Sequence, residues 1–307
     1  MTILYLQNSF QTSSIDKVCA FSFNHCQVCS NGFGHYKRCA RVANKLLEID
    51  KNIMVDFISR QNTHKYQSDW IVSKKLNSNN RFNFIQGEAT IEIDGINKNK
   101  QSINYNGISW LDNKMIEKSD LVISDNLASI LEIRSDVILM GSFLWSELIF
   151  NDNHKELYDY ANLELKLIKD IVPEMIALRD MAMPFVINHT KPFLTSWIVD
   201  FKYDLFVKTE INNILVLGGG TGYLDFDLAD VCEILSSSET YNIYTTNRIS
   251  LLLSNNISYD IFGFTNDEFK KIDLIIGRPG IGTLTDCVAH GIPIFGIGES
   301  DNTEIQH

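Results

Sequence analysis

The segment Asn31–Arg38, NGFGHYKR, combines two glycines, a histidine and the start of a predicted helix. Gly32 and Gly34 would allow the chain to turn sharply and to approach a ligand closely. His35 falls at or just before the first helical residue, where an imidazole tends to stay neutral and can act as a general base. A capping or packing histidine is the alternative interpretation. Arg38, one turn later, either holds an anion or faces solvent.

A second glycine-rich segment, GGGTG, follows the apolar residues ILVL. It has neither the Lys-Ser/Thr pair of a P-loop nor the glycine spacing of a dinucleotide-binding loop. Its small residues can still form a nest of N–H donors around a phosphate, with a flexible turn as the alternative. The candidate phosphate-binding residues here are Gly219, Gly220, Thr221 and Gly222.

A third glycine loop, RPGIG, separates a strand predicted over Asp273–Gly277 from a helix predicted over Thr283–His290. Glycine permits close approach of the backbone, and the positive end of a helix dipole favours an anion. A strand predicted over Pro293–Ile297 completes the unit. The candidate phosphate-binding residues of this loop are Arg278, Gly280, Gly282 and Thr283.

Two acidic residues near this loop are candidates for contacts with ligand hydroxyls. Thr283 and Asp286 have the spacing of an N-cap and N3 pair, which predicts a capping box. The alternative is that the Asp286 carboxylate accepts a hydrogen bond from a ligand hydroxyl. Glu304 follows the last predicted strand, where polar side chains face a cleft.

The composition excludes some classes of function. The chain has 307 residues, long enough for two domains, and its 27 basic and 38 acidic residues give a net charge of -11. Such an acidic chain is unsuited to sequence-independent nucleic-acid binding, which depends on basic patches. It contains neither a membrane-spanning apolar run nor a secretion signal. We therefore expect a cytoplasmic protein, with peripheral membrane contact as an alternative.

The cysteines raise the question of a metal site. Cys26, Cys29, His35 and Cys39 are spaced almost like the ligands of a small zinc knuckle. However, Cys39 falls on the apolar face of the following helix. We therefore favour ordinary buried thiols, and we predict neither a metal nor a cofactor.

Apolar periodicity predicts alternating strands and helices in the first part of the chain. A strand over Lys17–Asn24, a helix over Tyr36–Ile49 and a strand over Ile53–Ser59 would form a parallel βαβ unit. The less regular middle is predicted to hold a hairpin over Ala89–Asp94 and Gln101–Tyr105, strands over Asp120–Asp125 and Asp136–Met140, a short helix near Leu127–Ile133, and a helix over Glu156–Asp180 that Pro173 kinks or splits. The apolar stripe of that last helix indicates core packing, with a lipid-acceptor groove as the alternative.

A second α/β unit is predicted beyond a domain junction within Trp197–Asn213. Its first predicted elements are a strand over Asn213–Leu217, a helix near Asp225–Leu235, a strand over Tyr241–Thr245, a helix near Arg248–Leu253 and a strand near Ile257–Phe262. We place the two domains at residues 1–205 and 206–307. Two open sheets joined by a linker bind a ligand between them, at the carboxyl ends of their strands.

The segments GFGHYKRCARVANKL, ILVLGGGTG, DLIIGRPGIGTLTDCVAHGIPI and DNTEIQH resemble the two-domain GT-B glycosyltransferases. The similarity is closest to the branch that contains the peptidoglycan N-acetylglucosaminyltransferase and the UDP-sugar transferases. It implies an α/β fold of two Rossmann-like domains facing each other across a cleft. The family continues beyond the position of His307, so we expect the second domain to be truncated.

The resemblance implies a role for each matching residue. His35 would be the base on the acceptor hydroxyl, within an acceptor-side loop that includes Gly32, Gly34 and Arg38. The donor diphosphate would contact the second and third glycine loops, Asp286 would hold the ribose, and Glu304 would contact the sugar. Asp286 replaces the usual Glu of the family, and Ile305 stands where the family often has Gln.

The predicted activity is an inverting, metal-independent transfer of a sugar, of the hexosyltransferase type. The donor would be a nucleotide diphosphate sugar, expected to be a UDP-sugar, and the acceptor a hydroxyl compound. Two alternatives stay open. A nucleotide-sugar hydrolase of the same fold would use His35 on water, and a non-catalytic protein would only bind the nucleotide-sugar.

Overall fold

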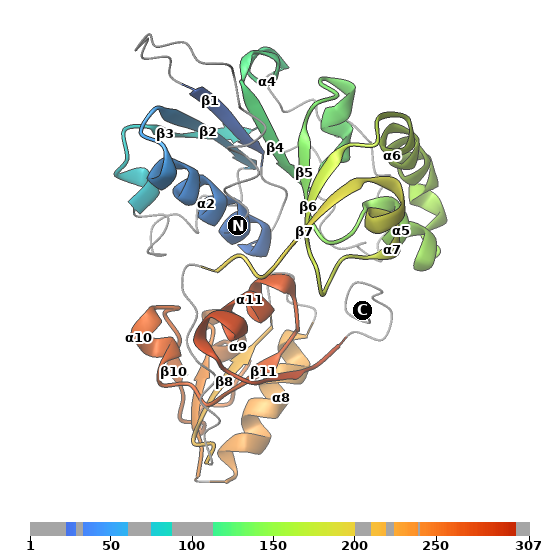
Figure 1. Ribbon diagram of the computed structural model, residues 1–307. Helices are drawn as coiled ribbons and strands as arrows, with labels where there is room; N and C mark the ends of the chain where they lie inside the picture. The colour runs from blue at the N-terminus through green and yellow to red at the C-terminus, as the bar shows by residue number, and fades with distance from the viewer. Residues whose placement is uncertain are drawn as a thin grey trace.

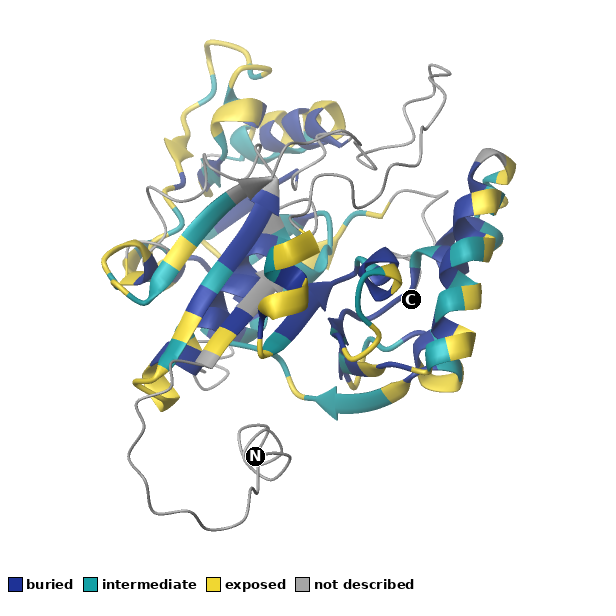
Figure 2. Cartoon of the chain, turned by 90° about the horizontal axis from the view of Figure 1, so that it is seen from above, coloured by how far each residue is buried: buried dark blue, intermediate teal, exposed yellow. Residues whose placement is uncertain are grey.

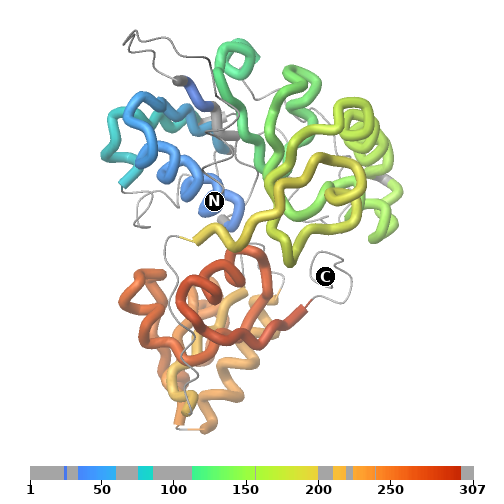
Figure 3. Tube along the Cα trace, viewed as in Figure 1, coloured from blue at the N-terminus to red at the C-terminus, as the bar shows by residue number. Residues whose placement is uncertain are grey.

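The chain forms two parallel β-sheets, each flanked by helices, as the computed structural model in Figure 1 shows. The structure describes residues 23–28, 33–60, 75–87, 113–199, 210–218, 224–238 and 240–298. Figure 3 traces the chain through the first sheet, in blue to yellow, and then through the second, in orange to red. The two sheets are consecutive in sequence, since the first ends at Thr195 and the second begins at Asn213.

The first sheet has the strand order β3-β2-β1-β4-β5-β6-β7, and all of its paired strands are parallel. Its strands are β1 Phe23–Val28, β2 Ile53–Arg60, β3 Phe82–Gly87, β4 Leu121–Asp125, β5 Ile138–Met140, β6 Glu174–Leu178 and β7 Lys191–Thr195. The order reverses between β1 and β4, and such a reversal opens a crevice at the carboxyl ends of the two strands. A ligand site of this domain is therefore expected beside Asp125, the last residue of β4.

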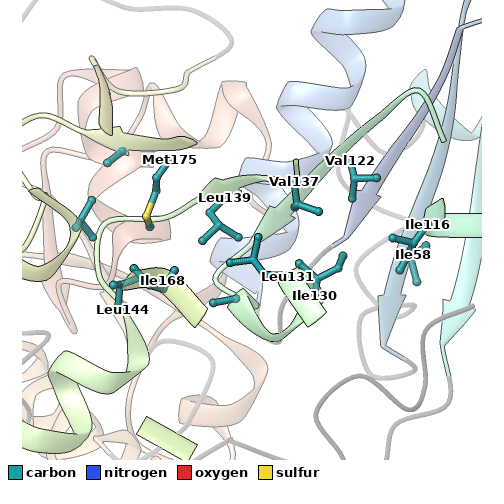
Figure 4. Close-up of a cluster of buried hydrophobic side chains, with 13 residues drawn as sticks. Ile58, Ile116, Val122, Ile130, Leu131, Val137, Leu139, Leu144, Ile168 and Met175 are labelled. Atoms are coloured by element: carbon teal, nitrogen blue, oxygen red, sulfur yellow. The ribbon is translucent and has the colours of Figure 1, made fainter. Parts of the chain in front are cut away.

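The helices of this domain are α2 Phe33–Ile49, α4 Asn113–Lys118, η2 Ala128–Glu132, α5 Trp145–Asn151, η3 Lys155–Leu157, α6 Tyr158–Ile171 and α7 Pro184–His189. Two cores fill the space between them and the sheet. One core joins α2 to β2 and β3 around Tyr36 and Phe57, whose rings meet edge to face at 5.6 Å. The other core, drawn in Figure 4, packs Ile130 of η2 and Ile168 of α6 with Leu139 and Met175 of the sheet.

The second sheet has the order β10-β9-β8-β11-β12 and is also parallel. Its strands are β8 Asn213–Leu217, β9 Asn242–Thr245, β10 Asp260–Ile261, β11 Leu274–Gly277 and β12 Ile294–Gly296. Its helices are α8 Asp225–Ser236, α9 Asn247–Ser250, α10 Asn266–Phe269 and α11 Ile281–His290. Figure 2 shows that the central strands are largely buried, whereas the helices carry both buried and exposed residues.

Gly277, the last residue of β11, lies close to the neighbouring strand β8 at the carboxyl edge of the second sheet, before the loop that leads to α11. A Cβ atom added there would lie 2.0 Å from the backbone oxygen of Leu217 on the neighbouring strand β8. Because that oxygen belongs to a buried central strand, it cannot move aside at low cost.

The variant Gly277→Ala is therefore expected to lower the free energy of unfolding by about 3 kcal/mol. Urea unfolding followed by circular dichroism measures the loss. Gly280→Ala is the matched control, since a Cβ there meets no atom within 4 Å, and it should cost no more than about 1 kcal/mol. Equal midpoints for the two variants would contradict the explanation.

The predicted elements of the second domain are confirmed. The strand over Asn213–Leu217 matches β8, and the helices near Asp225–Leu235 and over Thr283–His290 match α8 and α11 within two residues. The predicted strands over Tyr241–Thr245, Ile257–Phe262, Asp273–Gly277 and Pro293–Ile297 and the helix near Arg248–Leu253 contain or overlap β9, β10, β11, β12 and α9. In this domain the strands β8, β11 and β12 are short, mainly apolar runs that end at or just before a glycine or a polar residue, a pattern that favours a parallel sheet.

Two predictions in the first domain are wrong in part. The residues after Pro173 were expected to continue a helix, but Glu174–Leu178 form β6. Val172 ends α6 with a left-handed backbone at φ 51°, and the following apolar residues complete a buried strand. Of the strand predicted over Lys17–Asn24, residues 17–22 lie outside the described part of the chain. The strand β1 instead continues through His25–Val28, which were predicted as loop, because His25 is buried between β2 and β4.

Most of the other elements predicted in this domain are confirmed. The strands over Ile53–Ser59, Asp120–Asp125 and Asp136–Met140 are confirmed by β2, β4 and β5, and the short helix near Leu127–Ile133 is the 3₁₀ helix η2. The predicted helix over Tyr36–Ile49 begins three residues earlier, at Phe33. The predicted hairpin over Ala89–Asp94 and Gln101–Tyr105 lies outside the described residues. Within the described part of the chain, every helix is too short or too polar to cross a membrane.

Candidate active site

His35 lies in the first turn of α2 and contacts Asp125 at the carboxyl end of β4. The distance from His35 Nδ1 to Asp125 Oδ1 is 2.7 Å, and 21% of the His35 side chain is exposed, against 0% for Asp125. An ionised carboxylate only accepts hydrogen bonds, so Nδ1 carries the proton in this pair. The other ring nitrogen, Nε2, then has a free lone pair, which can accept a proton from a bound ligand.

Arg38 binds the same carboxylate from the next turn of α2. Its Nε and one terminal nitrogen donate to the two oxygens of Asp125 at 3.0 and 2.6 Å. The thiol of Cys39 also donates to Asp125, with a distance of 3.2 Å between Sγ and Oδ2. The residues His35, Arg38 and Cys39 thus face the sheet together, because i, i+3 and i+4 positions share one side of a helix.

Asp125 is ionised in this setting. Its complete burial would by itself raise the pKa of the carboxyl group, but the charges and hydrogen bonds of Arg38 and His35 outweigh burial. The pKa of Asp125 is therefore held well below its usual range. A permanently charged, immobile acceptor fixes the orientation of the His35 ring and stabilises the imidazolium once a proton arrives.

The N-terminus of α11 lies against Gly34, the residue before this histidine. A Cβ added at Gly34 would lie 3.3 Å from the backbone nitrogen of Gly282, and one added at Gly282 would lie 3.0 Å from the Cα of Gly34. Figure 1 shows α11 at the edge of the second domain that faces α2. The two helices can approach this closely because both positions are glycine. The contact brings the acceptor-side and donor-side loops predicted from the sequence together.

The first turn of α11 is suited to an anion. Gly280 is its N-cap, with no side-chain cap, and no acidic residue follows within the first turn. The first N–H groups of a helix have no intrahelical acceptor, and the helix dipole makes this end positive. Gly280, Gly282 and Thr283 therefore present backbone donors at the domain interface, and the Arg278 N–H donates to the Leu217 carbonyl at 3.2 Å.

Asp286 is placed differently from the expectation. The predicted capping box is wrong, because α11 begins at Ile281 and puts Asp286 in the second turn rather than at N3. The carboxylate is buried, and Lys37 of α2 reaches its Oδ2 at 2.7 Å. A cation of the first domain thus contacts the residue that the resemblance assigns to the ribose.

The glycine loop after β8 is followed by a helix with a different N-terminus. Asp225 and Asp227 stand in the first turn of α8, and Asp225 pairs with Arg248 at 2.8 Å. A Cβ at Gly218 would lie 2.1 Å from Asp225 Oδ1, so this carboxylate already covers the start of the loop. A phosphate is therefore favoured less at α8 than at α11.

Several predicted residues lie outside the described part of the chain. These are Gly32, Gly219, Gly220, Thr221, Gly222 and Glu304. Of the residues weighed for a zinc knuckle, Cys29 is also outside, while His35 and Cys39 both contact Asp125. Among the described residues, no cluster of three or more His, Cys, Asp or Glu side chains could hold a metal ion.

Asp125 was not singled out by the sequence analysis, although it ends a correctly predicted strand. One signal could have found it. An acidic residue at the carboxyl end of the strand that pairs with β1 across the reversal of strand order lies in the crevice where such sheets bind ligands. That inference needs the strand order, which periodicity does not give.

Comparison with known proteins rests on structure alone. No family model and no curated protein matches the chain. Its fold matches solved structures of UDP-glucose:anthocyanidin 3-O-glucosyltransferase in complex with UDP (TM-score 0.59, 10% identity, covering 93% of this chain and 83% of that chain) and of Medicago truncatula UGT71G1 complexed with UDP-glucose (0.59, 10%, 93% and 81%). It also matches CalG4, the calicheamicin glycosyltransferase (0.57, 10%, 92% and 82%).

These matches show the fold. The chain has the GT-B architecture of two Rossmann-like α/β domains, as the resemblance implied. The matched structures come from plant and antibiotic glycosyltransferases, and a specific likeness to the peptidoglycan branch is not among them. At about one identical residue in ten, the likeness assigns no activity to this chain.

Proposed function

We propose that this protein transfers a sugar from a nucleoside diphosphate donor, a UDP-sugar, to a hydroxyl acceptor, with inversion and without a metal. The observation that supports the proposal most directly is the contact between the two helix N-termini. It places the His35–Asp125 pair beside the uncapped first turn of α11. The matched solved structures support the donor class, since several contain UDP or UDP-glucose.

In the proposed reaction, Nε2 of His35 takes the proton of the acceptor hydroxyl. The acceptor oxygen forms a bond to the anomeric carbon of the sugar as the bond from that carbon to the diphosphate oxygen breaks. The leaving diphosphate carries the developing negative charge, which the N–H groups at Gly282 and Thr283 stabilise. Attack from the face opposite the leaving group inverts the anomeric configuration. Asp125 stays ionised and holds the imidazolium until the proton passes to solvent.

The acceptor is expected beside His35, at the carboxyl ends of β5, β6 and β7. A narrow hollow there is lined by Arg38 and by residues at the ends of these strands, and in this structure it is too small to hold a water molecule. Its lining is mainly apolar, with three polar residues, Arg38, Ser142 and Thr195. The Ser142 hydroxyl is buried and has no hydrogen-bond partner among the residues that the structure describes. This lining favours an acceptor with an apolar body and a polar group.

A thermal-shift screen against UDP, GDP, TDP and CMP tests the donor. UDP is expected to raise the melting temperature most, because a ligand that binds only the folded state stabilises it. UDP-glucose is then incubated with and without a panel of hydroxyl acceptors, and glycosylated products are measured by mass spectrometry. Release of free glucose at the same rate in both reactions would refute transfer and identify a nucleotide-sugar hydrolase.

A further inference from the structure

Two cations of α2 cross from the first domain to a single carboxylate of the second. Lys37 Nζ lies 2.7 Å from Asp286 Oδ2, and a terminal nitrogen of Arg41 lies 3.6 Å from Asp286 Oδ1. The three side chains are almost fully buried, with 4%, 7% and 9% exposed for Lys37, Arg41 and Asp286. We call this set the α2–α11 ion pair.

Lys37 also contacts an aromatic ring of the second domain, that of Phe264. Its Nζ lies 5.6 Å from the centre of the Phe264 ring, which favours a cation over its face. Phe264 has a left-handed backbone, with φ at 59°, a costly conformation for a bulky residue. The loop between β10 and α10 therefore adopts a strained backbone at the residue whose ring contacts this lysine.

The α2–α11 ion pair engages the carboxylate of Asp286, which the ribose of the donor would need as a hydrogen-bond acceptor. The ribose of a nucleotide donates its hydroxyl hydrogens to a carboxylate, and Asp286 is the residue proposed for that role. Each of its oxygens already faces a cation, and only 9% of the side chain is open. A ribose cannot reach Asp286 while Lys37 and Arg41 cover it.

We infer that Lys37 sets the affinity for the donor by competing with the donor ribose for Asp286. This inference rests on the proposed function, because it takes the nucleotide-sugar as the competing ligand. In the ligand-free protein the α2–α11 ion pair holds the two helix N-termini together. Donor binding displaces Lys37 from Asp286. The donor therefore binds with lower apparent affinity than the open site alone would give.

Removing the lysine charge tests this inference. Lys37→Met keeps the length and apolar stem of the side chain, and it leaves Asp286 with Arg41 as a partner. UDP should bind this variant about tenfold more tightly than the unmodified protein, as expected if about nine molecules in ten are closed without ligand. Isothermal titration calorimetry with UDP measures both affinities.

The matched control is Lys45→Met, on the same helix. Lys45 is exposed and pairs with Glu48 at 3.3 Å, so its loss removes one charge of α2 without touching Asp286. UDP affinity should stay within about twofold of the unmodified protein. Lys37→Gln, which keeps a donor but not the charge, should tighten binding in the same direction as Lys37→Met. Binding that is unchanged or weaker in both Lys37 variants would overturn the inference, and weaker binding would make Lys37 a donor ligand.

A measurement without nucleotide separates this inference from the proposed function. In Lys37→Met, backbone amides of α11 should exchange hydrogen severalfold faster, because α2 no longer holds that helix. Unchanged exchange would refute the α2–α11 ion pair as a closing contact, whatever the ligand. Failure of UDP to bind any of the proteins would instead refute the donor assignment, and the competition with it.

Discussion

Replacing His35 with alanine is expected to lower the turnover number for sugar transfer about a thousandfold, within the range that a general base supplies. The affinity for UDP should change by no more than about twofold, because the His35 ring contacts Asp125 and not the first turn of α11. Initial rates with saturating UDP-glucose and an identified acceptor, together with calorimetry, measure the two effects. His154→Ala, in the loop before η3, is the matched histidine control.

Asp125→Asn separates the role of the charge from that of the ring. The carboxamide has the size of the carboxylate but cannot stabilise an imidazolium, so the turnover number should also fall by at least tenfold. The buried Arg38 would lose its counter-charge, so this variant should unfold at a lower temperature as well. Full activity in His35→Ala would refute the base assignment. Full activity in Asp125→Asn would show that the ring needs no anionic partner.

Glu164, a buried residue of α6, is expected to make the stability of the protein depend strongly on pH. Its Oε2 accepts the backbone N–H of Ser146 at 2.5 Å, at the start of α5, where Leu144 offers no side-chain cap. Burial raises the pKa of Glu164 to about 7 from 4.5, against the hydrogen bonds from Ser146 and its neighbours. The folded protein therefore keeps a proton that the unfolded chain releases near pH 4.5.

The free energy of unfolding is therefore expected to fall as the pH rises. Below pH 4.5 both states are protonated at Glu164, so the folded state carries no penalty from this group. As the pH rises to 7, unfolding releases the proton and becomes more favourable, and above 7 the loss is complete. At about 1.4 kcal/mol for each pKa unit, Glu164 should make the protein about 3 kcal/mol less stable at pH 8 than at pH 4.

Glu164→Gln is expected to remove this part of the slope, because the amide oxygen still accepts the Ser146 N–H but does not ionise. Urea unfolding at several pH values between 4 and 8 measures the free energy of unfolding of both proteins. Asp159→Asn, which removes an exposed carboxylate from the first turn of the same helix, is the matched control. A slope that is the same in Glu164→Gln and in the unmodified protein would show that the pH dependence has another origin.

The sequence predicts the second domain well for a physical reason. In a parallel sheet covered on both faces, the central strands are nearly all apolar, and Ile214–Leu217 of β8 and Leu274–Ile276 of β11 are runs of this kind. Glycines follow or end both runs, at Gly218 and Gly277. Local signals and tertiary structure therefore agree in this half of the chain.

The secondary structure of the first domain is harder to predict from the sequence, because contacts between residues distant in sequence override local patterns. Pro173 is compatible with either a kinked helix or a strand, and pairing with β5 and β7 decides for the strand. His25 is polar, yet it is buried at the centre of the sheet.

Contacts between residues distant in sequence also limit how much of the candidate site can be predicted. The sequence places His35 and Gly282 in suitable loops, but Asp125 and Lys37 gain their roles only through partners about ninety and about two hundred and fifty positions away. Spacing along the chain carries no signal for such pairs, because the strand order and the approach of the two domains create them.

The helix α2 serves two surfaces at once. His35, Arg38 and Cys39 face Asp125 of their own domain, while Lys37 and Arg41 face Asp286 of the other. Every residue from Tyr36 to Arg41 is buried, whereas Lys45, Glu48 and Ile49 are exposed. Freedom to vary in evolution is therefore unequal along this helix. The exposed positions of its last turns can vary freely, but a change in its first two turns alters the chemistry of one domain or its fit to the other.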